Sequence, residues 1–459
     1  MNYQALLAGG TPVTAGLIGV GEFGLTLLAQ SRRIDGLALP VLCDREPDRV
    51  RTAALALGWH DDQVSFAGDR AAALGALERG DLVLTDDWSL VTELPLDVVV
   101  EATGDAETGA RSASSAIANG QHVVLVTKET DAVIGPLLSD RARSAGRVLS
   151  QVDGDQPSLT MGLASWARAL GLEVVCAGKA SEYDFVVDPA AGTVTAAGIS
   201  VEIDDVAALW DGPPADVAAR VAARAAACRD LPQRTTPDYC EMCLVANATG
   251  LKPDTAEMHA AIARTVELPD LFRPAAAGGV LGGAGRLDVF NCFRRPDEIS
   301  FAGGVFVVAG LPDRKTGALF AEKGIPVSAD RDYALLYNPT HLLGAEAPMS
   351  ILSAARLGRS TGSDDVRPVC DVVGQATRDL KAGTPLTEGH RHRIDGIEAR
   401  LVDYAPTGPG RPVPLFMVAG RILTRDVAAG ELLSFDAFEA PADSTLWQLR
   451  AEQDGGPTR

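Results

Sequence analysis

The stretch VTAGLIGVGEFGLTLLAQS, residues 13 to 31, constrains the fold more than any other part of the chain. An apolar strand pattern leads into three glycines with GxGxxG spacing, and a helical apolar pattern follows. In such a strand, turn and helix, the first glycine permits the tight turn, the second lets a pyrophosphate approach the backbone, and the third lets the helix pack on the strand. The stretch therefore predicts a Rossmann-type dinucleotide site. The residues predicted to face the cofactor here are Gly19, Gly21, Glu22, Phe23 and Gly24.

A second apolar stretch, LALPVLCD, ends at Asp44, 20 positions after Gly24. An acidic residue at this place can accept hydrogen bonds from the adenosine ribose of a dinucleotide. Asp44 favours NAD because its carboxylate repels a 2′-phosphate, whereas Arg45, directly after it, can accommodate that phosphate. The residues leave the choice between NAD and NADP open.

Two further strand patterns, PLDVVVEATGD and GQHVVLVTKETD, end in small and polar residues. In an open parallel sheet, ligands bind beyond the carboxyl ends of the strands. Thr127 or Glu129 alone would be interpreted as a loop or helix-cap residue, whereas Lys128 is harder to explain in that way. The residues predicted along this crevice are Ala102, Thr103, Gly104, Thr127, Lys128 and Glu129.

Three polar residues farther along are candidates for the substrate site. Asp153 and Asp155 lie in LSQVDGDQPSL, just before a helical pattern, so Asp155 is either a functional carboxylate or a helix cap. His341 lies in YNPTHLLGAEAPMSIL and is one of six histidines. A lone histidine is more often a structural residue than a catalyst, and both interpretations stay open.

The stretch EVVCAGKASEYD predicts a strand that ends at Gly178 and Lys179, with Glu182 soon after. A lysine whose pKa is lowered by burial and by a neighbouring cation can transfer a proton near neutral pH. The alternative is an ordinary solvated charge in a loop. Lys179 is therefore a candidate general acid.

The charge of the chain excludes some classes of partner. A formal net charge of −20 and a pI near 4.7 disfavour nucleic acids and anionic membranes. No cationic leader and no run of about 18 apolar residues is present, which predicts a cytoplasmic location. Seven scattered cysteines are typical of a reducing compartment. Cys240 and Cys243 form a CxxC without further ligands nearby, so we interpret them as neighbours on a helix; a divalent metal stays possible, but no spacing supports one.

An internal repeat lies near the end of the chain. ATRDLKAGTPL, residues 376 to 386, and ILTRDVAAGELL, residues 422 to 433, share the pattern T-R-D-apolar-x-A-G-x-x-L. Each predicts a short strand, a turn at Ala-Gly and a second strand. We expect a small β domain of two hairpin-like units that covers or oligomerises the main body.

Taken together, these motifs resemble the homoserine-dehydrogenase-like oxidoreductases with a C-terminal SAF (sialic-acid-synthase and antifreeze-like) domain. This group includes the 1-deoxy-D-xylulose 5-phosphate reductoisomerase-like enzymes. The resemblance covers nearly the whole chain and rests on GVGEFG, VVVEATGD, DGDQPSL, EVVCAGKASEY, VANATGL, NPTHLLGAE and the two TRD units. It implies an α/β fold with a Rossmann domain at 1–155, a central α+β substrate and oligomerisation domain at 156–362, and an SAF-like β domain with a tail at 363–459.

The same resemblance implies an activity. The expected protein is a dimer or tetramer that transfers a hydride between NADP, more often than NAD, and a small polar hydroxy or carbonyl compound, possibly phosphorylated. Lys128 lies in a motif similar to one whose lysine contacts substrate and nicotinamide. The family pattern Asp-Gly-Thr-Lys is replaced here by RTTPD, with Pro237 in place of the lysine, so Lys179 becomes the preferred general acid. The predicted catalytic residues are Lys179, Lys128, Glu182 and Asp155, and those for substrate are Asp153, Glu129 and His341.

Two alternatives remain. Full reductoisomerase chemistry needs a divalent metal, for which carboxylates but no strong ligand spacing are present. A non-catalytic NAD(P)-binding sensor or scaffold would keep the Rossmann fold without the reaction, because fold alone does not establish chemistry.

Overall fold

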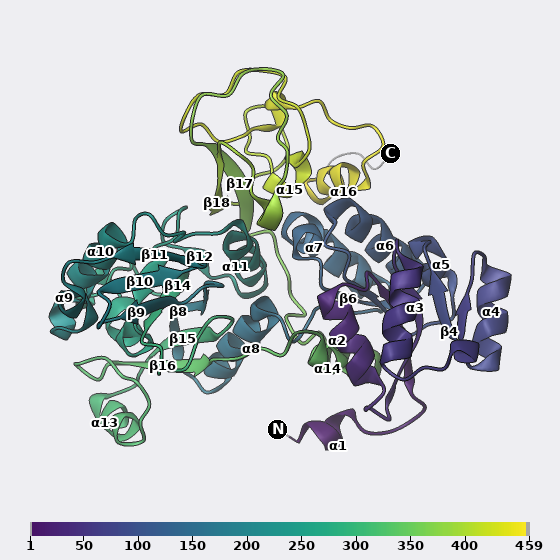
Figure 1. Cartoon of the computed structure of the whole chain (residues 1–459), viewed down its shortest axis with the longest axis horizontal. Coiled ribbons are helices and arrows are strands. Elements are labelled where there is room, and N and C mark those ends of the chain that lie inside the picture. The colour runs from purple at the N-terminus through teal and green to yellow at the C-terminus, as the bar shows by residue number, and fades with distance from the viewer. Residues whose placement is uncertain (1, 456–459) are drawn as a thin grey trace.

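Parallel strands build the N-terminal sheet of the computed structural model, which describes residues 2–455 (Figure 1). The strands are β1 (Val13–Ile18), β2 (Leu37–Cys43), β3 (Val64–Phe66), β4 (Leu82–Thr85), β5 (Val98–Glu101), β6 (His122–Leu125) and β7 (Leu149–Gln151). Their order is β3-β4-β2-β1-β5-β6-β7, and every pair is parallel. The helices of this part are α1 (Tyr3–Leu7), α2 (Glu22–Ser31), α3 (Pro47–Ala56), α4 (Arg70–Arg79), α5 (Trp88–Glu93), α6 (Ala106–Ala118) and α7 (Lys128–Ser144).

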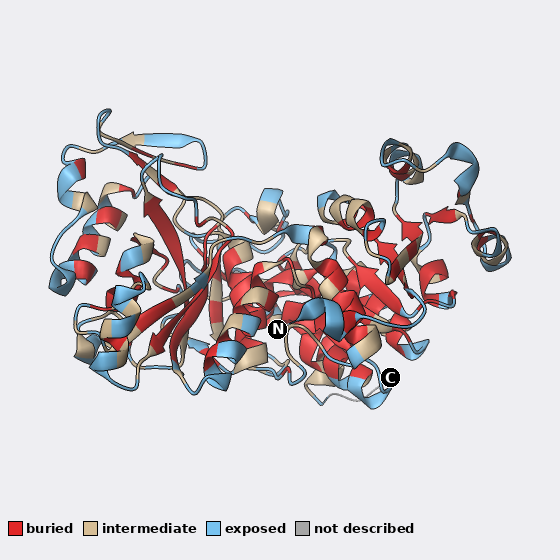
Figure 2. Ribbon diagram, turned by 90° about the horizontal axis from the view of Figure 1, so that it is seen from below, coloured by how far each residue is buried: buried red, intermediate tan, exposed pale blue. Residues whose placement is uncertain are grey.

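The strands of this sheet are continuous apolar runs because both faces of the sheet are buried. Val98 and Val100 of β5 belong to one hydrophobic cluster, while Val99 between them belongs to another. Successive side chains of a strand point to opposite faces, so helices must cover both faces. Figure 2 shows the strands buried beneath more exposed helices. The predicted Rossmann sheet is confirmed.

A mixed sheet forms the middle of the chain, also as predicted. Its main path is β11-β10-β9-β14-β8-β15-β16, and β12 and β13 pair with β14. The strands are β8 (Glu173–Ala180), β9 (Phe185–Asp188), β10 (Thr193–Ala196), β11 (Ile199–Glu202), β12 (Lys252–Pro253), β13 (Ala261–Ala263), β14 (Arg286–Arg294), β15 (Val305–Gly310) and β16 (Tyr333–Asn338). The helices are α8 (Gln156–Ala169), α9 (Val206–Trp210), α10 (Val217–Ala227), α11 (Thr236–Thr249), α12 (Leu268–Leu271) and α13 (Arg314–Glu322).

After β16 the chain returns to the N-terminal sheet. In α14 (Ala347–Leu352), Ala347 and Ile351 pack in the same cluster as Leu17 of β1. A Cβ on Gly344 would lie 2.2 Å from the carbonyl oxygen of Phe23, so this segment lies directly on the start of α2. The chain between β16 and residue 362, which was predicted to belong to the central domain, therefore also packs on the N-terminal domain. The domain boundaries stay predictions.

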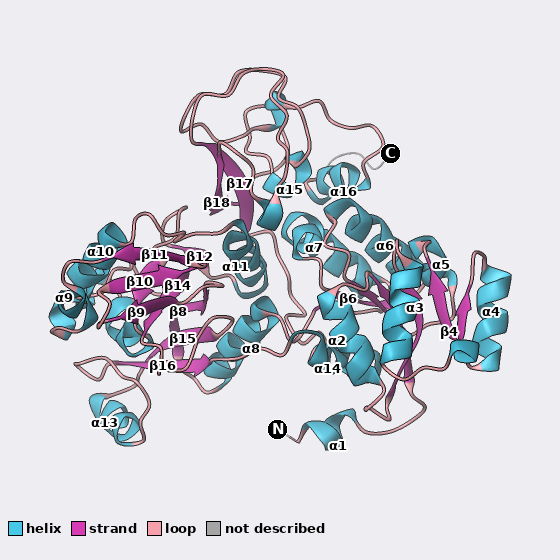
Figure 3. Ribbon diagram, in the orientation of Figure 1, coloured by secondary structure: helices cyan, strands magenta, loops and turns pink. Residues whose placement is uncertain are grey.

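The C-terminal part has little regular structure (Figure 3). It contains β17 (Cys370–Ala376) and β18 (Ile397–Asp403), which pair antiparallel, with α15 (Leu415–Val418) and α16 (Thr445–Gln453). No helix among residues 2–455 has the length and apolar character needed to cross a membrane.

The two repeat units pair with each other in antiparallel orientation. Leu380 bridges Val427, and the carboxylates of Asp379 and Asp426 each accept an N–H from the other unit, at 2.9 Å from Ala429 and Ala382 respectively. The prediction that each unit closes as its own hairpin was wrong, because the matching edges satisfy their backbone groups reciprocally.

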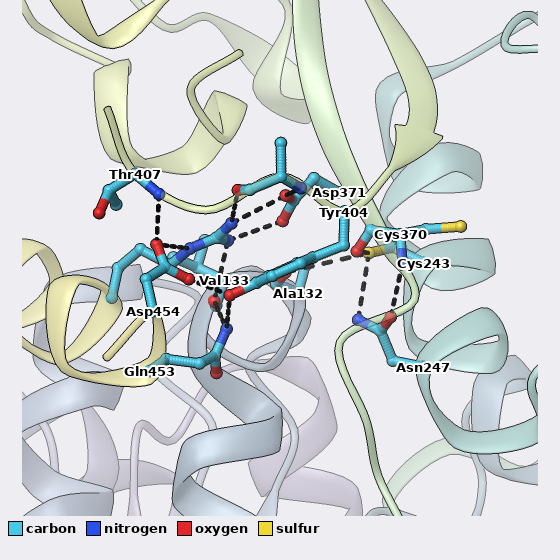
Figure 4. A network of polar contacts seen from close by, with 12 residues as sticks. Ala132, Val133, Cys243, Asn247, Cys370, Asp371, Tyr404, Thr407, Gln453 and Asp454 are labelled. Carbon is cyan, nitrogen blue, oxygen red and sulfur yellow. Dashed lines mark hydrogen bonds and ion pairs between the residues drawn. The ribbon is translucent and has the colours of Figure 1, made fainter. Parts of the chain in front are cut away.

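A buried polar network fastens this domain to α7 and α11 (Figure 4). Arg450 of α16 is fully buried and donates to the two carboxylate oxygens of Asp371 at 2.7 and 2.8 Å. It also donates to the carbonyl of Val133 on α7 at 3.3 Å. On α11, Asn247 accepts the N–H of Cys370 at 2.9 Å. The C-terminal domain thus bridges the two helices that begin beside the candidate site.

Candidate functional site

The turn after β1 has the backbone geometry that a dinucleotide requires. Gly19 has φ +91°, and a Cβ there would lie 2.4 Å from the carbonyl oxygen of Ala102. A Cβ on Gly24 would lie 2.7 Å from the Gly19 carbonyl oxygen, so helix and turn are in close contact. A Cβ on Gly21 would meet nothing within 4 Å. The start of α2 is therefore open to a pyrophosphate, and these residues fit a dinucleotide.

Asp44 is held in place beside this turn. Its carboxylate accepts the N–H of Val20 at 2.8 Å and of Glu46 at 3.0 Å, and Arg49 lies 3.0 Å away. Burial raises the pKa of Asp44, but these backbone hydrogen bonds and the Arg49 guanidinium outweigh it, so the pKa is lowered. Asp44 is thus ionised and oriented. Glu22 and Arg45 are exposed nearby in sequence.

A cavity of about 480 Å³ lies between the three parts of the chain. From the N-terminal domain, the predicted residues that line it are Phe23, Ala102, Gly104, Thr127, Lys128 and Glu129. The later predicted residues that line it are Asp155, Glu182 and His341. Thr127 also accepts the N–H of Gly104 at 2.9 Å, which fixes the ends of β5 and β6, whereas Thr103 turns back to the buried Glu101. The structure brings most predicted residues of the crevice together.

Lys128, the first residue of α7, opens a chain of charges behind the cavity. Its Nζ lies 2.9 Å from Asp155 and 2.7 Å from one carboxylate oxygen of Glu241. The other oxygen of Glu241 pairs with Lys179, whose Nζ lies 3.0 Å from Asp238. Two ammonium groups therefore share one carboxylate, and Lys128 is the one beside the cavity.

Lys179 lies at the end of a strand, as predicted, but its side chain is buried inside the sheet instead of facing the cavity. β8 continues through Lys179, which pairs in register with Val289 and Val305 inside the sheet, and its side chain is 0% exposed. Burial lowers its pKa, but Glu241 and Asp238 outweigh burial and raise the pKa above the usual lysine value. The expected pKa depression was wrong, because the partners are carboxylates. Lys179 does not line the cavity.

Lys128 and Glu241 of this network are also ionised. Burial lowers the pKa of Lys128, but Asp155 and Glu241 outweigh it and raise the pKa well above the usual value. Burial raises the pKa of Glu241, yet the two lysines bring it down to about 2. The ammonium of Lys128 is thus a permanent cation at neutral pH, suited to stabilising negative charge on oxygen.

Asp238 and Glu241 were not predicted, although both lie at the start of α11. They are three residues apart, which places them on one face of the helix. Their Asp-x-x-Glu spacing ahead of VANATGL was the available signal. Pro237 occupies the first turn, where its missing N–H costs no helical hydrogen bond. The ammonium of Lys179 instead reaches this end of the helix from β8.

Asp153 lies outside the residues that line the cavity. Its carboxylate accepts from Ser158, its N–H donates to Ser350 at 2.7 Å, and burial raises its pKa. In this structure Asp153 thus fixes the segment before α8, and its contact with substrate stays a prediction. Asp155 caps α8 through the N–H of Gln156 at 2.9 Å, which confirms the cap interpretation. It also pairs with Lys128, and its catalytic role stays a prediction.

From the loop 389–393 of the C-terminal domain, Arg391 lines the cavity. Arg391 pairs with Glu182, and His392 lies 2.8 Å from Glu129. Both loop residues have φ near +58°, a left-handed conformation that non-glycine residues seldom adopt. Burial lowers the pKa of His392, but hydrogen bonds to Glu129 and Glu388 raise it to about 9. Sequence patterns gave no signal for these contacts, because they join segments far apart in the chain.

Comparison with known families supports an oxidoreductase. Residues 154–347 match the family model described as "Oxidoreductase DRL, catalytic domain". A 1-deoxy-D-xylulose 5-phosphate reductoisomerase of Chlorobium limicola is 30% identical over 152 residues, which cover 31% of this chain and 35% of that protein. The match thus spans about a third of the relative's length.

Solved structures give more distant resemblances. A putative oxidoreductase from Klebsiella pneumoniae covers 78% of this chain and 88% of its own, with 15% identity and a TM-score of 0.35. The reductoisomerase of Zymomonas mobilis in complex with NADPH covers 37% of this chain and 46% of its own, with 20% identity and a TM-score of 0.27. The strand order of the chain itself shows the Rossmann-like fold. The match of residues 154–347 shows that this part of the chain is similar to the catalytic domain of an oxidoreductase family.

Proposed function

We propose that the protein is an NAD(P)-dependent oxidoreductase that transfers a hydride to or from a small polar hydroxy or carbonyl compound. The observation that carries this proposal is the meeting of two features at one cavity. Phe23, from the dinucleotide turn, and Lys128, with its carboxylate partners, line the same 480 Å³ space. The match of residues 154–347 to an oxidoreductase catalytic domain supports it.

The bound nicotinamide would supply or accept the hydride. Lys128 would donate a hydrogen bond to the substrate oxygen and stabilise the alkoxide that develops there. Asp155 and Glu241 would hold the ammonium in place, and Lys179 would position Glu241 from behind. In the direction of reduction, the alkoxide would take its proton from water, because Lys128 with its raised pKa stays an ammonium.

The choice of cofactor is a prediction that leans toward NADP. The ionised Asp44 opposes a 2′-phosphate, while Arg45 and Arg49 supply two guanidinium groups nearby. Because the family resemblance favours NADP, we expect these arginines to outweigh Asp44. Arg45→Ala should then weaken NADPH binding by about tenfold or more, with little effect on NADH.

The first experiment is a parallel fluorescence titration with NADH and NADPH, followed by a panel of hydroxy-carbonyl compounds and sugar phosphates. Saturable cofactor binding and turnover of any panel member would support the proposal. Binding without turnover across the panel would favour a sensor or scaffold. No binding to either cofactor would refute the proposal at its first step.

Reductoisomerase chemistry is a second candidate, favoured by the similarity to the Chlorobium limicola protein. A divalent metal would need the carboxylates of the cavity, but Glu129, Glu182 and Asp155 each face a cation in this structure. The arrangement does not fit a metal, so we route no step through one. Absence of methylerythritol phosphate after incubation of deoxyxylulose phosphate with NADPH and Mg²⁺ would eliminate this candidate.

Association as a dimer or tetramer through the middle domain is a further proposal. Light scattering during size-exclusion chromatography would test it directly, and a mass of one 47.8 kDa chain at micromolar concentration would refute it.

A further inference from the structure

A second cavity, of about 810 Å³, lies between the start of α11 and the β18 side of the C-terminal domain. Five arginines line it: Arg229, Arg234, Arg391, Arg393 and Arg400. The chain as a whole carries a net charge of −20. The cavity therefore has a local cluster of positive charges although the protein as a whole is negative, and an anion site requires such a cluster.

The acidic residues of this cavity already have arginine partners. Arg400 lies 2.8 Å from Glu398 and 3.4 Å from Glu257. Asp395 pairs with Arg378, which does not line the cavity. Arg400 and Arg378 thus offset two of these three negative charges, and the remaining one is outnumbered by the other arginines of the cavity.

Three arginines of the cavity have no carboxylate partner among residues 2–455: Arg229, Arg234 and Arg393. Arg229 and Arg393 are exposed. Arg234 is fixed by its Nε and Nη2, which donate to the backbone carbonyls of residues 257 to 259 at 3.1 to 3.2 Å. Its Nη1 makes no hydrogen bond within the described part of the chain. The positive end of α11, whose cap residue Thr235 also lines the cavity, adds to the field.

We propose that this cavity binds a small phosphorylated anion, and that Arg391 couples its occupancy to the catalytic cavity. Planar guanidinium groups bind phosphate oxygens in pairs, which makes phosphate the ligand chemistry that best fits an arginine cluster. The proposal does not depend on which reaction the protein catalyses.

Arg391 is the side chain that lines both cavities. Its guanidinium pairs with Glu182 of the catalytic cavity and lies 4.5 Å from the ring centre of Tyr183, which lines the second cavity. A phosphate in the second cavity competes with Glu182 for this guanidinium. Its binding releases Glu182 into the catalytic cavity and loosens the loop 389–393, and the coupling is reciprocal.

The test is isothermal titration of the full chain with inorganic phosphate. The variant Arg229→Gln/Arg393→Gln removes two exposed charges of the cavity, and Arg33→Gln/Arg411→Gln makes the same change of charge at exposed positions that do not line it. We expect saturable binding that weakens at least tenfold in the first variant and less than twofold in the control. No saturable binding, or equal affinity in both variants, would overturn the proposal, because phosphate would then be absent or bound elsewhere, as at the turn after β1.

The coupling has its own readout. Phosphate should increase hydrogen exchange in the loop 389–393 of the native protein, and Arg391→Gln should abolish this response. Unchanged hydrogen exchange of the loop would overturn the role of Arg391.

Once a substrate is found, phosphate that changes its KM by about 5- to 150-fold without simple competition would support a separate site. Simple competition would overturn it, because the cavity would then hold the anionic group of the substrate. Because phosphate binding is measured without turnover, a negative phosphate titration would overturn this proposal and leave the proposed hydride transfer untouched.

Discussion

Replacing Lys179 by methionine removes the cation from the most deeply buried part of the charge network. The side chain is 0% exposed, and its partners Asp238 and Glu241 are 3% and 5% exposed. Glu241 retains Lys128, but Asp238 keeps only neutral donors, the hydroxyls of Ser181 and Thr235 at 2.8 Å. Breaking a buried ion pair from one side costs about 3–5 kcal/mol. At about 2–4 °C per kcal/mol, the melting temperature should fall by about 6–20 °C.

The loss should depend on pH in a defined direction. In the native protein the pKa of Glu241 is lowered to about 2 from 4.5, so its stabilisation is present above pH 4.5 and is lost only as the pH falls toward 2. Without Lys179 the pKa of Glu241 rises in the folded state, because one of the two lysines that lower it is gone. The stability deficit should therefore be larger at pH 8 than at pH 5, where protonation relieves the unpaired charge.

Calorimetric melting from pH 5 to 8 measures both effects. Lys381→Met is the matched control, because it removes a lysine from an exposed pair with Asp426 that lies 2.8 Å away, and surface pairs contribute little. A loss below about 1 kcal/mol for Lys179→Met, or a loss independent of pH, would refute the buried network.

Three more changes separate the parts of the site. Lys128→Met should lower kcat by about 100- to 1,000-fold while NAD(P)H fluorescence titration shows retained binding; near-normal turnover would contradict its role. Gly19→Ala should lower the melting temperature, because Gly19 has φ +91° and a Cβ there would meet the carbonyl oxygen of Ala102. Gly21→Ala should weaken only cofactor binding, because a Cβ there would meet nothing within 4 Å. An equal fall of the melting temperature in both variants would contradict this contrast. The pKa of His392 is raised to about 9 from 6.5, so its stabilisation of the loop is complete below pH 6.5 and is lost as the pH rises to 9. Proteolysis of the loop should accelerate over that range and should be insensitive to pH in His392→Gln.

Local patterns predicted the nucleotide end of the fold well. The GxGxxG turn, the strands that follow and the acidic residue at the end of β2 depend on spacing within about 30 residues, and the parallel sheet brings their carboxyl ends together. Lys128 was identified on the same grounds.

Tertiary partners decided the parts that the sequence did not predict. The pKa of Lys179 was expected to fall, but Glu241 lies 62 residues away and reverses the direction. Neither the pairing of Arg391 with Glu182 nor the pairing of the two repeat units with each other follows from a periodic pattern. These features depend on which distant surfaces meet, and no local spacing encodes that.

The position of Arg391 and His392 late in the chain also sets the order in which the contacts of the site form during synthesis. Domains generally fold in order as the chain leaves the ribosome. A nascent chain that ends before residue 389 already contains the nucleotide turn, both lysines and their carboxylates, but it lacks Arg391 and His392, the partners of Glu182 and Glu129. The C-terminal domain thus adds its contacts after the lysines are in place, so a protein terminated before residue 389 should retain cofactor binding but lack the contacts of Arg391 and His392.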